Sequence, residues 1–296
     1  MKLNPVSIVI LALVLGLNLA PARGLPAEDR PPNVVFFLVD DLGWRDLGCY
    51  GSSLYETPQI DAFAQQSVRF TQAYAACHVC SPTRASIMTG KYPVRLGLTD
   101  WLPGRKEFDF QRLSNAATIQ QLPLEELTIA EALREHGYRT AHLGKWHLGE
   151  EPFGPLQQGF DIQIPRWNKG WPKAGYHAPF ELDGLEDDGY LTDRLTAEAE
   201  KFIDENRDQP FFLYLSHFAV HDPIEGRDDL VAKYQNKLQS HALSNDAAFL
   251  LEGNPDAALP LAAAELKSRS QSPDWSGYRV LPDRTVKIKQ IQDNVQ

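Results

Sequence analysis

The chain has 296 residues, with 39 acidic and 29 basic side chains and a formal net charge of −10 at pH 7. This acidic balance argues against nucleic-acid binding, which needs a basic surface to neutralise phosphates. Three cysteines are too few, and odd in number, for a disulfide framework. The length suffices for one sizeable hydrophobic core.

The N-terminus has the pattern of a secretory signal peptide. Lys2 precedes an apolar run over residues 6–20, and an Ala-Pro-Ala site ends at Ala22. We expect residues 1–22 to be cleaved and residues 23–31 to form a linker, so that the protein is exported to the periplasm or secreted. The apolar run is shorter than the roughly 20 residues that span a bilayer. No later stretch is long enough, so we expect no stable membrane insertion.

The first half of the chain predicts a strand, a helix, a second strand and a second helix. Residues 33–39 form a continuous apolar run, which is typical of a strand buried on both faces of a parallel sheet. A Thr-Pro pair predicts the start of a helix over residues 57–68. Residues 68–74 indicate a short strand, and residues 82–88 a helix that begins immediately after Cys80.

The second half continues this alternation. A threonine start and a glycine end predict a helix over residues 128–137, followed by a strand over residues 138–143. A helix over residues 191–203 and a buried strand over residues 210–218 follow. Strands that alternate with helices predict an α/β domain, in which helices sandwich a mainly parallel sheet.

Two segments lack this periodicity. Residues 165–189 contain several glycines and aromatic side chains, and we expect a long loop over a pocket, where substrate specificity would lie. Residues 226–296 are polar and weakly patterned. The regular pattern therefore covers the chain up to about residue 225.

Polar side chains follow three of the predicted strands. Asp40 and Asp41 end the first apolar run, Lys145 and His147 follow the strand over 138–143, and His221 follows the last strand. Open parallel sheets bind ligands beyond the carboxyl ends of their strands. We therefore expect these side chains at one edge of the sheet. Two residues that lie two apart on a strand share a face, which predicts that Lys145 and His147 point at a single ligand.

The most specific pattern surrounds Cys80, which is followed by Pro82 and Arg84 in a C-x-P-x-R arrangement. With the Asp-Asp pair, the Gly-Lys-Trp-His-Leu-Gly string at 144–149 and His-Asp-Pro at 221–223, it resembles the type I sulfatases. The resemblance implies an alkaline-phosphatase-like fold. It also implies hydrolysis of sulfate monoesters, either aryl or carbohydrate sulfates, as sulfatases catalyse.

The resemblance assigns a role to each of these residues. A maturation enzyme would oxidise Cys80 to formylglycine, whose hydrate attacks sulfur. Asp40, Asp41 and the modified Cys80 would bind one calcium ion. Arg84 would hold the formylglycine.

The other three residues would contact the substrate. By the same resemblance, Lys145 would contact the sulfate and His147 the hydroxyl of the hydrate. His221 would contact the sulfate and act as an acid for the leaving group. The expected partners are thus a sulfated small molecule or glycan and a formylglycine-generating enzyme.

The family pattern also includes a second pair of metal ligands in a Ser-Asp-x-Gly context, which this sequence does not contain. Asp293 and Asn294 follow a polar, alternating stretch, so we do not expect them to be that pair. The chain thus looks like an incomplete catalytic domain over residues 32–296, without the later strands and the small C-terminal subdomain. We expect little or no sulfatase activity from it as given.

Alternatives stay open at this point. A phosphoesterase or phosphonate hydrolase of the same superfamily would share the metal site and the edge of the sheet. A non-catalytic remnant that binds sulfated glycans is a second alternative. Cys49 and Cys77 could pair and leave Cys80 free. We assign the remaining histidines to packing or to the surface, namely those at 78, 136, 142, 177, 217 and 241.

Overall fold

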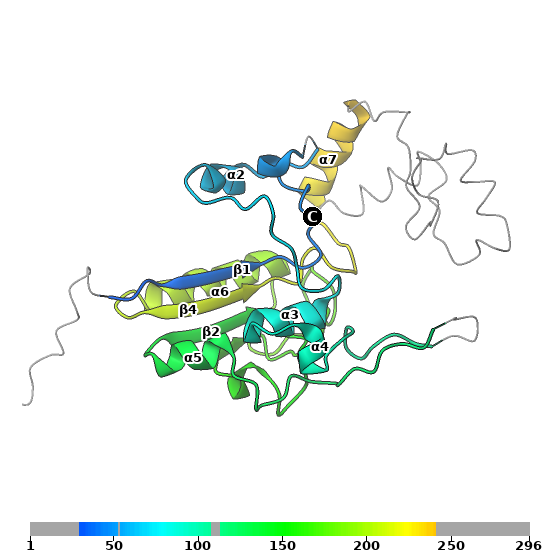
Figure 1. Ribbon diagram of the computed structural model, residues 1–296. Coiled ribbons are helices and arrows are strands. Elements are labelled where there is room, and N and C mark those ends of the chain that lie inside the picture. The colour runs from blue at the N-terminus through cyan, green and yellow to red at the C-terminus, as the bar shows by residue number, and fades with distance from the viewer. Residues whose placement is uncertain (1–29, 53, 108–112, 241–296) are drawn as a thin grey trace, which may run out of the picture.

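A computed structural model describes residues 30–52, 54–107 and 113–240. Its centre is a sheet of four strands in the order β1-β4-β2-β3, and all neighbours pair in parallel (Figure 1). The strands are β1 (Val34–Leu38), β2 (Arg139–Gly144), β3 (Ile162–Ile164) and β4 (Phe211–Ser216). The predicted parallel α/β architecture is confirmed, although β3 was not foreseen.

Helices cover both faces of the sheet (Figure 1). The helices α3 (Cys80–Thr89), α4 (Pro93–Leu96) and α5 (Ile129–Glu135) lie on one side, and α6 (Leu191–Glu205) lies on the other. The described part of the chain also contains η1 (Gly48–Tyr50), α2 (Pro58–Gln65), η2 (Pro155–Gln157) and α7 (Asp228–Ser240). No helix among the described residues is long and apolar enough to cross a membrane.

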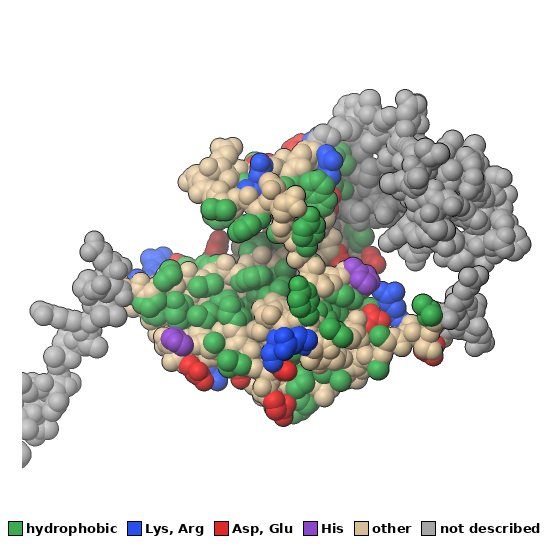
Figure 2. All heavy atoms as spheres, viewed as in Figure 1, with side chains coloured by type: hydrophobic (Ala, Val, Ile, Leu, Met, Phe, Trp, Pro, Cys, Tyr) green, Lys and Arg blue, Asp and Glu red, His purple; other side chains and the backbone are tan. Residues whose placement is uncertain are grey.

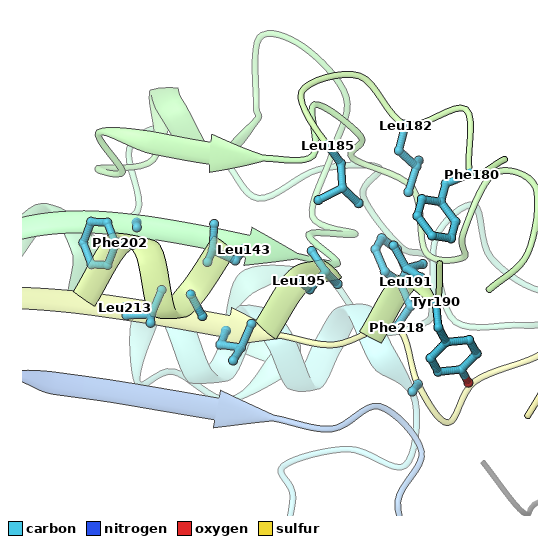
Figure 3. Close-up of a cluster of buried hydrophobic side chains, with 14 of the residues drawn as sticks. Leu143, Phe180, Leu182, Leu185, Tyr190, Leu191, Leu195, Phe202, Leu213 and Phe218 are labelled. Atoms are coloured by element: carbon cyan, nitrogen blue, oxygen red, sulfur yellow. The ribbon is translucent and has the colours of Figure 1, made fainter. Parts of the chain in front are cut away.

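Strand β4 divides the hydrophobic core into two clusters. All six of its residues are buried, and successive side chains of a strand point to opposite faces. Phe212 and Tyr214 therefore pack into the cluster under α3 and α5, whereas Leu213 packs into the cluster under α6. Figure 3 shows this second cluster around Leu213. A strand buried on both faces is what the apolar run at 210–218 predicts.

Helix α5 begins where its sequence predicts. The Thr128 hydroxyl accepts a hydrogen bond from the backbone of Glu131 (3.1 Å), and the Glu131 carboxylate accepts one from the backbone of Thr128 (2.8 Å). This reciprocal pair satisfies two helix N–H groups that otherwise lack partners. Gly137 follows the helix with a φ of 83°, a conformation that glycine adopts without strain.

The segment 165–189 is a loop, as predicted, in that its only β-pairing is an isolated bridge from His177 to Tyr190. It is nevertheless part of the core, because Tyr176, Phe180 and Leu182 are buried in the cluster under α6 (Figure 3). The loop is therefore anchored by apolar side chains and does not lie only on the surface.

The prediction that β1 is buried on both faces is wrong. Its burial alternates, and Val35 and Phe37 are 49% and 56% exposed. The reason is its place at the edge of the described sheet, beside the part that α6 covers, because α6 packs against β2 and β4. Figure 2 shows hydrophobic side chains along this side of the sheet. A continuous apolar run thus identified the strand but not its surroundings.

The segment that follows α2 also differs from its prediction. Helix α2 ends at Gln65, and residues 68–74 form no strand and are exposed. A β-rich composition does not make a strand without a neighbour to pair with. Residues 1–22 and 241–296, including Asp293 and Asn294, lie outside the described residues.

Helix α7 was not foreseen in the weakly patterned region, and it packs beside the segment before α2 (Figure 1). The Tyr234 hydroxyl accepts a hydrogen bond from the backbone of Glu56 (2.8 Å), and Lys237 forms an ion pair with the Glu56 carboxylate (3.0 Å). These contacts join residues that lie 178 positions or more apart in the chain. The helix is therefore part of the tertiary fold.

Candidate active site at the carboxyl edge of the sheet

The centre of the site is Asp40, which follows β1 and is buried. Arg84 Nη2 donates to Asp40 Oδ1 over 2.8 Å, and Lys145 Nζ donates to Asp40 Oδ2. Arg84 Nη1 also donates to the carbonyl of Lys145 (2.8 Å) and to Ser216 Oγ (2.6 Å). The structure thus brings together side chains from α3 and from the ends of β1, β2 and β4, of which Asp40 and Lys145 were expected at this edge.

The charges in this group are strongly coupled. Burial by itself would raise the pKa of Asp40, but the Arg84 guanidinium and the Lys145 ammonium outweigh it, so the pKa lies below its usual value. Burial, helped by the Arg84 charge, lowers the pKa of Lys145, while the Asp40 carboxylate opposes this shift. One carboxylate between two buried cations leaves a net positive charge, which favours an anionic ligand.

Asp41 lies beside the candidate acid His221. His221 Nε2 is 4.0 Å from Asp41 Oδ2, and His221 Nδ1 donates to the carbonyl of Asp222 (2.7 Å). Because Nδ1 carries the hydrogen, a neutral His221 presents the lone pair of Nε2 toward the carboxylate. One ligand atom from each of Asp40, Asp41 and His221 lies within 4.8 Å of the others, and these form the only such group among the described residues.

This group fits a divalent cation in part. Two adjacent carboxylates are hard oxygen donors, and a histidine held through Nδ1 is oriented as a metal ligand. Both oxygens of Asp40 already accept hydrogen bonds from cationic side chains, so an ion would share them with Arg84 and Lys145. Calcium takes six to eight oxygen ligands, so further ligands would have to come from water, from the substrate or from outside the described residues.

Cys80 occupies the first position of α3 and is half-buried. It lines a cavity of about 480 Å³ together with Asp40, Asp41 and Arg84. The residue before it, Val79, is extended and makes no side-chain cap, so the first N–H groups of the helix have no side-chain partner from this position. Helix N-termini attract anions for this reason.

Lys145 and His147 diverge, contrary to the prediction that they share a strand face. Strand β2 ends at Gly144, and His147 has a φ of 57°, so the period of two no longer applies. Lys145 contacts Asp40, whereas His147 Nε2 donates to the carbonyl of Leu102 (2.7 Å). Burial, and then the Lys145 charge, lower the pKa of His147 to about 3, so the imidazole is neutral at pH 7.

His147 lines a second cavity, of about 300 Å³, under the loop 165–189. Trp171 and Lys169 from that loop line it too, and the Trp171 ring meets the His147 ring edge-on with centroids 6.4 Å apart. Sequence reasoning placed the loop over a pocket and noted Trp171 among its aromatic side chains, but it did not predict which side chains line the cavity. It also missed Ser216, whose only signal was its place at the end of an apolar strand.

The possible pairing of Cys49 with Cys77 is not seen. All three cysteines are free, and Cys49 lines a separate cavity near η1 and α2. Cys77 instead lines the cavity of Cys80. Among the other histidines, His142 and His217 are buried and His136 is exposed, as expected of packing and surface positions.

Comparison with known proteins identifies the family of this chain. A family model described as Sulfatase matches residues 32–264. The chain belongs to the sulfatase family. Mouse N-acetylgalactosamine-6-sulfatase is 32% identical over 86% of this chain, and human arylsulfatase A is 37% identical over 70% of it.

Solved structures share the sulfatase fold with this chain. The crystal structure of Ps i-CgsB is 33% identical, with a TM-score of 0.58 over 70% of this chain. A protein solved in complex with its substrate D-glucosamine-2-N,6-O-disulfate is 26% identical, with a TM-score of 0.59 over 90% of this chain. The chain spans about half the length of these relatives, namely 55% and 44% of the two curated proteins and 49% of each solved chain.

We expect one buried histidine of this sulfatase-family chain, His217, to lower the free energy of unfolding at acid pH. Burial lowers the pKa of His217 to about 4, and neither ring nitrogen has a hydrogen-bond partner among the described residues. The unfolded chain binds this proton near pH 6.5, so the stability associated with neutral His217 is present above that pH and is lost as the pH falls toward 4.

We expect the His217→Phe variant to lose less of its free energy of unfolding as the pH falls. Its ring packs 5.0 Å from Phe37, so an aromatic replacement fits the same surroundings. Urea unfolding at pH 7 and at pH 4.5 should show a smaller difference than in the unmodified chain, by about 1 kcal/mol per pH unit. The same change at the exposed His136 is the control. If the free energy of unfolding changed equally with pH in the two variants, the assignment of the acid sensitivity to His217 would be wrong.

Proposed function

We propose that the protein hydrolyses sulfate monoesters at the carboxyl edge of its sheet, with Cys80 as the residue that matures to formylglycine. The observation that carries this proposal is the position of Cys80 at the start of α3, in one cavity with Asp40, Asp41 and Arg84. Membership of the sulfatase family supports the reaction class. A formylglycine hydrate would supply an oxygen nucleophile that a thiol cannot provide.

The protein's own charges would bind the sulfuryl group. Arg84 and Lys145 together exceed the charge of Asp40, and the free N–H groups at the start of α3 add to the positive potential. Because Arg84 is held by Ser216 and by the Lys145 carbonyl, its charge is fixed in place before the substrate arrives. Such preorganised charge stabilises an anionic transition state more than mobile charge does.

Asp40 and Asp41 would hold a calcium ion, which would neutralise negative charge that develops on the sulfate oxygens. His221 is the side chain of this edge that can move a proton at the surface of the site, since it is partly exposed. His147 is neutral, and its buried Nδ1 has no partner among the described residues, so it can accept a hydrogen bond from a hydroxyl group. The positions of Asp40, Asp41 and His221 support the roles that the family resemblance implies, whereas His147 lines a separate cavity and its role rests on the resemblance alone.

The substrate class is part of this proposal. One neighbour binds D-glucosamine-2-N,6-O-disulfate in its solved structure, and another was solved in complex with a neocarrahexaose. We propose carbohydrate sulfates as the first class to test, with aryl sulfates as general probes.

The N-terminal pattern supports export, and the maturation of Cys80 would require a formylglycine-generating enzyme.

Mass spectrometry of the digested protein tests the proposal directly. Trypsin releases Cys80 in the peptide Phe70–Arg84 and Cys49 in the peptide Asp46–Arg69. After co-expression with a formylglycine-generating enzyme, we expect the first peptide to exchange one sulfur and two hydrogens for an oxygen. The Cys49 peptide should keep its thiol and serves as the internal control. A Phe70–Arg84 peptide that remains entirely in the thiol form would refute the proposal.

A further inference from the structure

Cys80 has a second cysteine close to it in the chain. Cys77, His78, Val79 and Cys80 form a C-x-x-C sequence that ends at the first position of α3. Both cysteines are free and half-buried, and both line the cavity of about 480 Å³. A C-x-x-C sequence at a helix N-terminus is a common arrangement of redox-active thiols. The proposed hydrolysis uses Cys80 but gives Cys77 no role.

The Thr83 side chain holds the segment from Cys77 to Val79 against the first turn of α3. The Thr83 hydroxyl is 2.7 Å from the carbonyl oxygen of Cys77 and 2.9 Å from that of Val79. Because one hydroxyl contacts both carbonyls, the chain before the helix is folded back over its first turn. Disulfides need such closeness, since the Cα atoms of bonded cysteines lie about 4.4–6.8 Å apart.

The surroundings of Cys77 suit it for attack on a disulfide. Its Sγ is 3.9 Å from Nδ1 of His78, whose Nε2 is 3.2 Å from Nη2 of Arg105. Arginine only donates hydrogen bonds, so Nε2 must accept and Nδ1 of a neutral His78 carries the hydrogen. This N–H faces the sulfur and can stabilise negative charge on it.

We propose that Cys77 and Cys80 are a redox pair whose disulfide withholds Cys80 from maturation. The oxidant is a small disulfide such as oxidised glutathione. The Cys77 sulfur attacks one glutathione sulfur, the glutathione S–S bond breaks and one glutathione thiol leaves. The Cys80 sulfur then attacks the Cys77 sulfur of the mixed disulfide, and the second glutathione thiol leaves. Two protein thiols are oxidised, and one glutathione disulfide is reduced to two thiols.

The proposal does not depend on sulfate hydrolysis, because the disulfide forms from the unmodified cysteines. Its consequence for the enzyme is that an oxidising environment removes the thiol that would become formylglycine. Reduction would restore it. The ratio of disulfide to thiol at the start of α3 would therefore set the fraction of protein that can mature.

The test is equilibration of the full chain, without maturation enzyme, in glutathione buffers from fully reduced to fully oxidised. After free thiols are blocked, we expect the peptide Phe70–Arg84 to become lighter by two hydrogens, with no added blocking group. Free thiols should fall from three to one per chain. In a Cys49→Ser variant the peptide Phe70–Arg84 should show the same mass change, and no free thiol should remain after oxidation. A Phe70–Arg84 peptide that stays reduced throughout, or that is cross-linked to Asp46–Arg69, would overturn the proposal.

A Cys77→Ser variant provides the second measurement. In this variant the peptide Phe70–Arg84 should not become lighter by two hydrogens. Oxidation should instead end with glutathione bound to Cys80 through a mixed disulfide. On co-expression with a maturation enzyme under oxidising conditions, it should contain more formylglycine than the unmodified chain. Equal fractions in the two proteins would refute the regulatory part of the proposal. A failure of the proposed function would differ, because then neither protein would contain formylglycine in any buffer.

Discussion

Replacing Asp40 by asparagine is expected to lower the free energy of unfolding by about 3–5 kcal/mol. The carboxylate is 6% exposed and lies between the side chains of Arg84 and Lys145, which are 2% and 0% exposed. Asparagine keeps the shape but removes the only carboxylate that forms an ion pair with these two cations among the described residues. Its amide also brings donors toward side chains that only donate. Neutralisation of Lys145 would offset part of the loss, since burial already lowers its pKa.

Asp41→Asn is the matched control for this variant. The same chemical change occurs one residue later, at a side chain that is 58% exposed and lies 4.0 Å from the imidazole of His221. We expect a change of less than about 1 kcal/mol there. Both variants should be unfolded in urea at pH 7 with a chelator present, so that bound calcium does not contribute. Similar losses for the two variants would contradict the buried ion-pair network.

Replacing Gly144 by alanine is expected to have the other large effect. Gly144 ends β2 with a φ of 104°, and a Cβ atom there would lie 1.9 Å from the carbonyl oxygen of Ser216. That oxygen belongs to β4 and accepts a hydrogen bond from the backbone of Lys145 (2.7 Å). The clash is with backbone, so relief requires the two strand ends to separate. We expect a loss of more than about 3 kcal/mol, or no folded protein.

The Gly137→Ala variant is the control that measures the cost of positive φ without a steric clash. Gly137 lies at the other end of β2 with a φ of 83°, but a Cβ atom there would meet nothing within 4 Å. Its cost should therefore be only that of a non-glycine residue at positive φ, about 1–2 kcal/mol. Circular dichroism and urea unfolding of both variants measure the difference. Equal losses would show that positive φ, and not the contact with Ser216, determines the requirement for glycine.

The local sequence identified several of the elements and the polar residues that follow the strands. The apolar runs at 33–39 and 210–218 identify β1 and β4, and the capping residues around α5 fix its limits, because these signals depend on neighbouring residues only. In a parallel sheet the carboxyl ends of the strands meet at one edge. The convergence of Asp40, Lys145 and His221 on that edge therefore followed from the sequence.

Tertiary structure alone decided which of these side chains touch. Arg84 and Lys145 lie 44 and 105 positions from Asp40, and no local pattern predicts that both reach its carboxylate. Strand order decided that β1 is an edge strand with one exposed face. His147 turned away from Lys145 because β2 ends at Gly144, three residues before His147, so the two side chains do not share a strand face. Such outcomes depend on register and packing between distant segments, which a single sequence does not display.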